Sequence, residues 1–351
     1  MSIVTLRLPE VKREAGKRPE KCPYCNGTIL QRWGKVNKPV RDIKMRNVSP
    51  YRYRCWHCRR TFRHYPQGVD RADQTLRLRK FAALCWVFGL SYRKLTIVFE
   101  AFGVSISHMS AWRDAQEIAQ ALKRSKCWKS VRVMGLDGAF VRGMGKTNPV
   151  LITVDLGTGK PVEIGYIDER DPQAVRKWLE PIVKRLGVTV IVTDDHSSFR
   201  VVAEQLGLEH QVCQFHVRRW VGRGLKQLRE TVPKEYLWVV EEVKQLIDEL
   251  PPDGSRRLFE LWKEVKVRRK GRGAFTPVDQ LRNLLIRLSE NWERYCTFYW
   301  QNEVPWTNNG TEQVIGKAKI RSKSVRGYKS EQGMLNGLML ASSGIWRSEY
   351  L

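Results

Sequence analysis

The chain has 351 residues, and its 63 Lys and Arg residues exceed its 36 Asp and Glu residues to give a formal net charge of +27. A chain of this length holds two or three domains with separate cores, and a basic excess of this size indicates a polyanionic partner such as nucleic acid. No membrane partner is expected, because the longest apolar run, 81–90, is about half of the roughly 20 residues that a spanning helix needs. The alternative is a basic protein without a nucleic-acid partner.

The start of the chain shows no charged segment followed by an apolar stretch and a small-residue cleavage site, so we expect no secretory signal. The compartment is then reducing. The eight cysteines are therefore expected to be metal ligands or buried thiols rather than disulfides. Residues 1–20 mix charges without an apolar period and are expected to form an N-terminal arm.

Residues 21–66 contain two Cys-x-x-Cys pairs. Each pair brings two thiols onto one side of a tight turn, and two pairs complete a closed, tetrahedral and therefore structural zinc site. The interval between the pairs is longer than usual, but a β-hairpin can fill it, so we predict a zinc ribbon. The alternatives are a chance spacing, or His57 or His64 in place of one cysteine. The predicted ligands are Cys22, Cys25, Cys55 and Cys58.

Arginines alternate with aromatic residues around the second cysteine pair. Such a basic and aromatic face suits contact with the DNA backbone. The alternative is that these arginines only solvate a small domain. The candidate DNA-binding residues are Arg52, Arg54, Arg59 and Arg60.

Residues 67–125 have a helical period. Helices are predicted over Ala72–Phe88 and Ser91–Phe102, and a third opens after Gly103. A helix, a glycine turn and a helix that begins with small polar residues match a helix-turn-helix, whose second helix enters the major groove. The alternative is a purely structural helix bundle. The candidate DNA-reading residues are Ser105, Ser107, His108 and Arg113.

Residues 130–216 change to short apolar strands alternating with helices, which is typical of an α/β core. Residues 217–305 return to long helical periods, broken at Pro251-Pro252, and residues 306–351 are predicted to be helical after Thr307. The predicted elements of the α/β part are the strands Val131–Phe140, Val150–Asp155, Pro161–Ile167, Val188–Thr193 and Glu209–Gln214 and the helices Pro172–Leu186 and Ser198–Leu206.

Three acidic residues occupy positions typical of a catalytic site. Asp137 and Asp194 come at the ends of apolar strands, where open α/β sheets place their ligands and chemistry. Glu312 falls in the first turns of a helix that Thr307 or Asn308 would cap. Three carboxylates brought together repel one another, and two Mg²⁺ or Mn²⁺ ions would relieve that repulsion and support an in-line displacement at phosphorus.

The order of these motifs resembles the DDE transposases of bacterial and archaeal insertion sequences and is similar to the Mutator-like superfamily. The motifs are the two strand-end acids, Cys213-Gln-Phe-His216, a helical block, and Thr307-Asn-Asn-Gly-Thr-Glu312 followed by basic residues and Gly-Tyr-Lys. The resemblance covers residues 131–330. It implies an α/β RNase H-like catalytic core with an all-α insertion over 217–305, joined to the N-terminal zinc ribbon and helical DNA-binding domain.

The resemblance implies that Asp137, Asp194 and Glu312 are the three catalytic acids and metal ligands, with Asp195 as the alternative second acid. It also places His216 near the active site as a further catalytic residue, whereas the alternative is that Cys213 and His216 are packing residues. The basic residues after Glu312 would hold the DNA end, unless they form only a solvated face. These candidates are Lys319, Lys323, Arg326 and Lys329.

The function that the resemblance implies is transposition. The protein would bind the inverted-repeat ends of an insertion sequence as a homodimer or higher oligomer, cut the double-stranded DNA and join it to target DNA, in the cytoplasm of a prokaryotic host. A nuclease or resolvase would use the same acids with water as the only nucleophile. A catalytically silent DNA-binding regulator would lack the acids, and the intact set argues against it.

Overall fold

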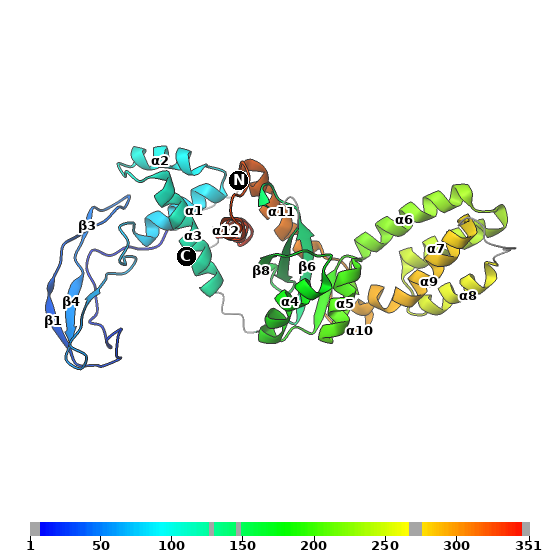
Figure 1. Ribbon diagram of the computed structural model, residues 1–351, viewed down its shortest axis with the longest axis horizontal. Coiled ribbons are helices and arrows are strands. Elements are labelled where there is room, and N and C mark those ends of the chain that lie inside the picture. Colours follow the sequence, from blue (N-terminus) through cyan, green and yellow to red (C-terminus); the bar gives the residue numbers. More distant parts are fainter. Residues whose placement is uncertain (1–7, 126–129, 145–148, 267–275, 346–351) are drawn as a thin grey trace. The chain divides into compact units, whose positions relative to one another are not determined.

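The computed structural model describes residues 8–125, 130–144, 149–266 and 276–345 (Figure 1). The chain forms two compact units. The first contains the N-terminal segments together with the residues from Ile320 onward, and the second contains the described residues from 130 to Lys319. No helix within the described ranges is both long and apolar enough to cross a membrane.

An antiparallel sheet lies in the first unit, where the zinc ribbon is predicted. Its order is β1-β4-β5, with Leu30 opposite Cys55, and β4 turns Tyr53 and Cys55 toward the buried face while Arg52 and Arg54 remain half-buried. Two further short strands, β2 and β3, pair with each other. The strands are β1 (Leu30–Lys35), β2 (Lys38–Pro39), β3 (Asn47–Val48), β4 (Tyr51–Cys55) and β5 (Thr61–His64).

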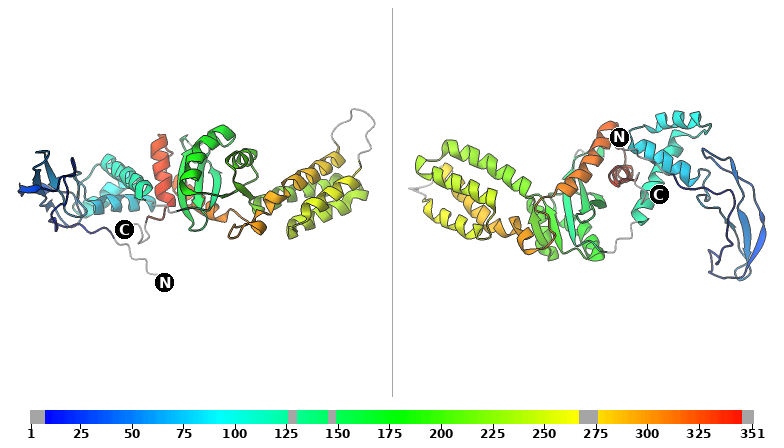
Figure 2. Two further views of the ribbon diagram at one scale, coloured as in Figure 1. Left: turned by 90° about the horizontal axis from the view of Figure 1, so that it is seen from below. Right: turned by 180° about the vertical axis from the view of Figure 1, so that it is seen from behind.

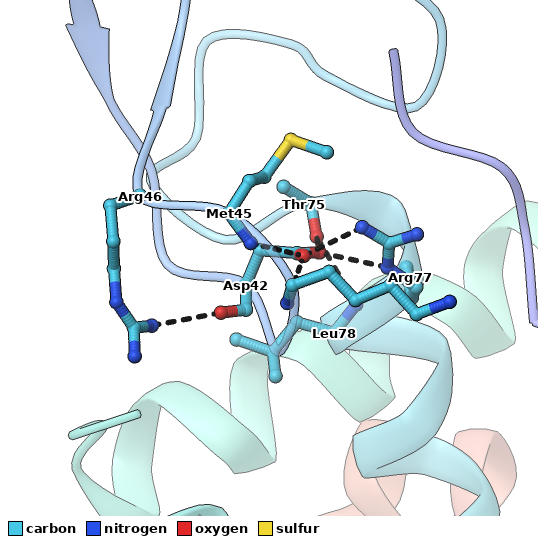
Figure 3. A network of polar contacts seen from close by, with 7 residues as sticks. Asp42, Met45, Arg46, Thr75, Arg77 and Leu78 are labelled. Atoms are coloured by element: carbon cyan, nitrogen blue, oxygen red, sulfur yellow. Dashed lines mark hydrogen bonds and ion pairs between the residues drawn. The ribbon is translucent and has the colours of Figure 1, made fainter. Parts of the chain in front are cut away.

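A buried acid connects this segment to the helices that follow (Figure 3). Asp42 is fully buried and accepts hydrogen bonds from Arg77 Nη2 at 2.6 Å, Arg77 Nε at 3.1 Å and Thr75 Oγ1. Burial by itself would raise the pKa of Asp42, but the bonds from Arg77, Thr75 and the Lys44 amide outweigh it and hold the pKa below its ordinary value. The boundary predicted at residue 66 therefore does not separate two independent bodies.

Three helices continue the first unit as the sequence indicated, with different starts. The helix predicted from Ala72 begins only at Leu76, because Thr75 is extended and its side chain caps the Leu78 amide. Ser91 caps the second helix in the same way. The third helix packs against both of the others. The helices are α1 (Leu76–Val87), α2 (Tyr92–Ala101) and α3 (His108–Ser125).

The end of the chain corrects one predicted boundary. Residues 306–351 were expected to belong to the catalytic core, but the residues from Ile320 group with the first unit. The cause is α12 (Glu331–Ser342), which packs against α1 and α3. Its Leu340 and the following Ile345 are fully buried among apolar residues of α1 and α3. Burial of this apolar surface determines where the segment docks.

The second unit is built on a five-stranded sheet in the order β10-β9-β6-β7-β8. β7 runs antiparallel to both β6 and β8, whereas β9 runs parallel to β6 and β10 parallel to β9. This order and these directions are those of an RNase H-like sheet, as the sequence predicted. The strands are β6 (Val133–Ala139), β7 (Val150–Asp155), β8 (Lys160–Tyr166), β9 (Val190–Thr193) and β10 (Glu209–Val212).

The two faces of this sheet are covered differently. On one face, α4 (Pro172–Leu186) and α5 (Ser197–Leu206) pack over a core that includes Met134 and Leu136 of β6. Residues alternate between faces along a strand. Gly135 and Asp137 therefore lie on the opposite face, which also receives α11 (Asn309–Ser324).

The helical insertion forms a bundle with its own core, green to orange in Figure 2, and its α9 and α10 contact β10. The boundary predicted between 216 and 217 is wrong, because α6 already begins at Gln214 and carries His216 in its first turn. The helices are α6 (Gln214–Thr231), α7 (Leu237–Glu249), α8 (Gly254–Glu264), α9 (Pro277–Tyr295) and α10 (Thr297–Trp300), with a short 3₁₀ turn at Lys234–Tyr236.

The Asp42 network predicts a large stability effect. Asp42→Ala should lower the free energy of unfolding by about 3–5 kcal/mol, because it leaves the Arg77 guanidinium buried without a counter-charge. Urea unfolding followed by circular dichroism measures this. The control is Glu14→Ala, which removes an exposed ion pair with Lys35 and should cost no more than about 1 kcal/mol.

The same network predicts a pH dependence. The pKa of Asp42 is lower in the folded chain, so its contribution is complete above the unfolded value of about 3.9 and is lost as the pH falls through the folded pKa. The stability difference between wild type and Asp42→Ala should therefore shrink only in that acidic range. A constant difference down to the acid-unfolding limit would contradict the proposed electrostatic origin.

Candidate active site

The structure brings the three predicted acids together. Asp137 lies on β6, and Asp194 directly follows β9, the parallel neighbour of β6. The carboxyl ends of these strands therefore meet at one edge of the sheet. Glu312 occupies the first turn of α11. The charges of Asp194, His216 and Glu312 all act on the Asp137 carboxyl.

The acids form a strained electrostatic cluster. Burial, followed by the negative charge of Asp194, raises the pKa of Asp137 to about 6. Burial also raises the pKa of Asp194, against the opposing effect of His216 and His196. The Asp194 Oδ1 atom is buried and has no hydrogen-bond partner among the described residues. Carboxylate oxygens are the ligands that Mg²⁺ and Mn²⁺ prefer, so the chemistry of these three side chains fits such ions.

Asp194 and its neighbour Asp195 have different surroundings. Asp195 Oδ2 accepts a bond from Arg287 Nη2 of α9 at 2.6 Å. Its charge is therefore already compensated by a cation of the helical insertion. Within the described ranges, Asp194 Oδ1 has no such partner. This difference favours Asp194 over Asp195 as the second acid.

Asn308 attaches the helix of Glu312 to the sheet. Its side-chain Nδ2 donates to the Leu136 carbonyl at 3.1 Å, and its Oδ1 accepts from Thr311 Oγ1 at 2.6 Å. Its own carbonyl accepts the Glu312 amide at 3.1 Å. Since Leu136 precedes Asp137 in β6, one buried amide side chain links the start of the helix that carries Glu312 to the strand that carries Asp137.

Gly135 makes this close approach possible. A Cβ at position 135 would overlap Thr311 Oγ1 and would lie 2.6 Å from Asn308 Oδ1. Any larger residue in β6 at this point would push α11 away from the sheet. The requirement is steric, because Gly135 does not have a positive φ.

Cys213 and His216 have separate roles in the geometry. The buried Cys213 accepts the Asn308 amide on its sulfur at 3.2 Å, and its own amide donates to the Thr193 carbonyl at 2.7 Å. It therefore fixes the end of β10 between β9 and α11. His216 Nε2 lies 3.9 Å from Glu312 Oε1. The hydrogen bond with Cys213 raises the pKa of His216, so a positive charge beside the acids is favoured.

Sequence reasoning missed a fourth carboxylate. Glu169 follows β8, and a Cβ on Gly138 would overlap its carboxylate, so it lies next to the residue after Asp137. Burial raises the pKa of Glu169, and the charge of Asp194 adds to the effect. No motif around Glu169 points to this position. The absence of a side chain at Gly138, which leaves room for the Glu169 carboxylate, is the one related feature of the local sequence.

A cleft of about 520 Å³ opens beside Asp194 and His216. Arg219, Arg223 and Arg287 line it together with Trp220, and the Arg287 guanidinium lies 4.2 Å from the centre of the Trp220 ring. Cations beside an acidic cluster suit a bound phosphate backbone. These arginines belong to none of the predicted motifs, although Arg219 and Arg223 follow His216 at helical spacing on α6.

The four predicted zinc ligands also come together. Cys22 Sγ lies 3.7 Å from Cys58 Sγ, and Cys25 Sγ lies 3.6 Å from Cys55 Sγ. All four sulfurs lie within 4.8 Å of one another, and neither His57 nor His64 belongs to the group. Tetrahedral zinc with bonds of about 2.3 Å would separate its sulfurs by about 3.8 Å. The sulfur geometry therefore fits such an ion.

The arginines predicted to bind DNA near the cysteines partly cover aromatic rings. The Arg54 guanidinium lies 5.0 Å from the centre of the Trp33 ring, and that of Arg60 lies 5.4 Å from the Tyr24 ring. Arg59 and Arg60 are exposed, whereas Arg52 is half-buried. Cation and ring pairs of this kind order the guanidinium groups without neutralising them.

The predicted DNA-reading residues at α3 differ in their local roles. Ser107 Oγ accepts the Ser110 amide at 3.1 Å, so this side chain caps the helix start. Ser105, His108 and Arg113 are exposed. The basic candidates after Glu312 are also exposed, namely Lys319, Lys323, Arg326 and Lys329.

The RNase H-like sheet with acids at the carboxyl ends of β6 and β9 defines a class of nucleic-acid-processing enzymes. Within that class, residues 162–336 match the model described as the transposase IS66 family. Over 330 residues, the chain is 22% identical to an uncharacterized 48.3 kDa protein of insertion element ISM1 from Methanobrevibacter smithii, and the match covers 90% of this chain and 80% of that protein. The chain belongs to the DDE-type insertion-sequence transposases.

Two solved structures were also matched. The catalytic core domain of BIV integrase is 16% identical, and the match covers 49% of this chain and 100% of that chain with a TM-score of 0.21. The Drosophila P element transposase strand transfer complex is 10% identical, and the match covers 77% of this chain and 92% of that chain with a TM-score of 0.39. At these TM-scores the superpositions add nothing to the strand order described above.

The packing around Gly135 predicts the effect of a single methyl group. Gly135→Ala should lower the free energy of unfolding by about 1–3 kcal/mol, because the added Cβ overlaps Thr311 and displaces the start of α11. Thermal unfolding measures this. Gly316→Ala is the matched control on α11, because no atom lies within 4 Å of its added Cβ and alanine favours a helix interior by about 1 kcal/mol. Equal effects of the two substitutions would contradict the packing argument.

Proposed function

We propose that this transposase cuts double-stranded DNA at the ends of its insertion element and joins the freed ends to target DNA, using two Mg²⁺ or Mn²⁺ ions held by Asp137, Asp194 and Glu312. The observation that carries the proposal is the cluster of these acids with an unpartnered buried oxygen on Asp194. The arginine-lined cleft beside the cluster supports a phosphate backbone as the substrate.

Each residue of the site has a part in this proposal. Bound metal ions would activate a water or 3′-hydroxyl nucleophile and stabilise the leaving oxygen. The chain itself orients the scissile strand, with Arg219 and Arg223 contacting phosphates in the cleft. His216 holds Glu312 by charge from α6 and is a positioning residue. Asn308 keeps α11 in register with β6.

The first unit supplies DNA recognition in this proposal. Its four cysteines bind a structural zinc ion, and the exposed arginines beside them contact the DNA backbone. Residues at the start of α3 read bases in the major groove. Assembly into a homodimer or higher oligomer on DNA stays a prediction.

The acids should act as one unit. Asp137→Ala, Asp194→Ala and Glu312→Ala should each reduce DNA cleavage and joining by roughly three orders of magnitude or more, because each removes ligand oxygens from a shared site. DNA affinity should persist or rise, since each change removes negative charge facing phosphate. The assay uses labelled inverted-repeat DNA from the element with Mg²⁺ or Mn²⁺, and fluorescence anisotropy measures binding.

Asp195→Ala is the matched control, because it changes the adjacent carboxylate that pairs with Arg287. It should retain activity well above that of Asp194→Ala. If Asp195→Ala is inactive and Asp194→Ala is active, the second ligand is Asp195 and the proposed mechanism is unchanged. Metal-dependent cleavage that survives in both Asp137→Ala and Glu312→Ala would refute the proposal. Cut products without joined products in the wild type would favour a nuclease.

The cysteine cluster predicts about one zinc ion per chain. Cys22→Ser combined with Cys55→Ser should abolish tightly bound zinc and destabilise the first unit, because structural zinc binding contributes to the free energy of folding. Elemental analysis of the purified protein measures the metal. Cys85→Ser changes a half-buried thiol outside the cluster and should leave the zinc content unchanged. A folded wild-type chain without zinc would show that the proposed site is wrong.

A further inference from the structure

A cavity of about 730 Å³ lies within the first unit, between the helices α1 to α3 on one side and the end of α11 with the segment that follows it on the other. Its volume falls in the range of small-ligand pockets. Four aromatic side chains line it. They are Trp86, Tyr92, Trp112 and Tyr328. The proposed catalytic chemistry uses none of them.

The aromatic residues provide a stacking surface. Trp86 is almost fully buried and lies parallel to Tyr92, with ring centres 6.0 Å apart and planes at 13°. The Arg321 guanidinium lies 4.4 Å from the centre of the Trp86 ring, also inside the lining. Tyr92, Trp112 and Tyr328 remain half-buried, so part of each side chain is exposed. Flat, polarisable rings of this kind stack on nucleobases of any sequence.

Two polar atoms of the lining residues have no hydrogen-bond partner among the residues that the structure describes. The Tyr328 hydroxyl and the Arg321 Nε are buried and have no hydrogen-bond partner in the described part of the chain. Burial raises the pKa of Tyr328 to about 12, so its hydroxyl stays a neutral donor. A buried donor without an acceptor is unfavourable. A ligand with carbonyl or ring-nitrogen acceptors would satisfy such donors.

The positive charge of the cavity lining favours an anionic ligand. Arg93, Arg326 and Lys329 line the cavity and are exposed to solvent, and none of the described lining residues is acidic. His108, Arg326 and Lys329 are also among the residues predicted to contact DNA. A purely apolar partner would make no use of these cations. A nucleotide combines the aromatic and anionic parts that the cavity matches.

We propose that this cavity binds one unpaired nucleotide of the DNA that the first unit holds, with the base stacked against the aromatic residues and its phosphate near Arg93, Arg326 and Lys329. The proposal rests on the proposed DNA-binding function and deepens it. Trp112 and Tyr328 would form the stacking site. The unpairing of one base is least costly where the duplex is already distorted, so the cavity favours DNA with a displaced base.

The test compares two duplexes of one sequence, one fully paired and one with a single extrahelical thymine, bound to the full-length protein in fluorescence anisotropy. The wild type should bind the bulged duplex about tenfold more tightly. Trp112→Ala and Tyr328→Ala should bring the ratio of affinities close to one, and Trp112→Phe should retain it. Because the readout is a ratio, a general loss of DNA affinity cancels.

Phe102→Ala is the control, since Phe102 is 51% exposed and does not line the cavity, and it should keep the wild-type ratio. A second probe replaces the thymine with 2-aminopurine, whose fluorescence should be quenched by stacking in the wild type but not in Trp112→Ala. Equal affinities in the wild type, or a preference that survives in both alanine variants, would overturn the proposal. The proposal would also be overturned if free thymidine monophosphate bound as tightly as the bulged duplex. A chain that binds neither duplex would instead refute the DNA-binding function itself.

Discussion

The hydrogen bonds of Asn308 hold the proposed active site together. Three segments that are far apart in sequence meet at this buried side chain and its amide: the middle of β6, the Cys213 sulfur after β10 and the first turn of α11. Each bond contributes only about 1 kcal/mol net. Their importance is geometric, because they set the position of Glu312 relative to Asp137. The proposed binding of two metal ions depends on that position.

Much of the catalytic core follows from local patterns in the sequence. The bounds of β7 and α4 agree with the predicted segments, because a continuous apolar run defines β7 and an Asp171 cap with Pro172 defines the start of α4. Asp137 and Asp194 were predictable as strand-end acids. The distinction between Asp194 and Asp195 was not, because it depends on Arg287, which is 92 residues away. Glu169 was also missed because its role depends on a distant residue. Its carboxylate lies next to Gly138, and such a contact produces no periodic pattern in the sequence.

In the first unit, the domain boundaries predicted from the sequence do not correspond to separate bodies. Their spacing identified the cysteine pairs, and the helical period with its glycine turns identified the three helices. The ion pair of Asp42 with Arg77 joins these parts, and nothing in the local pattern distinguishes a buried aspartate in a loop from a solvated one. The docking of α12 was equally hidden, because an apolar helix near the end of a chain carries no information about which core it will cover.

The close packing at Gly135 constrains three positions of the chain together. Thr311 and Asn308 occupy the volume that any side chain at 135 would need. A related chain that carries alanine or serine at this point of the strand must therefore also carry smaller or differently placed side chains at the start of the last catalytic helix. In an alignment of relatives, the three positions should change together or not at all. Their joint pattern would indicate which members keep the helix packed against the sheet.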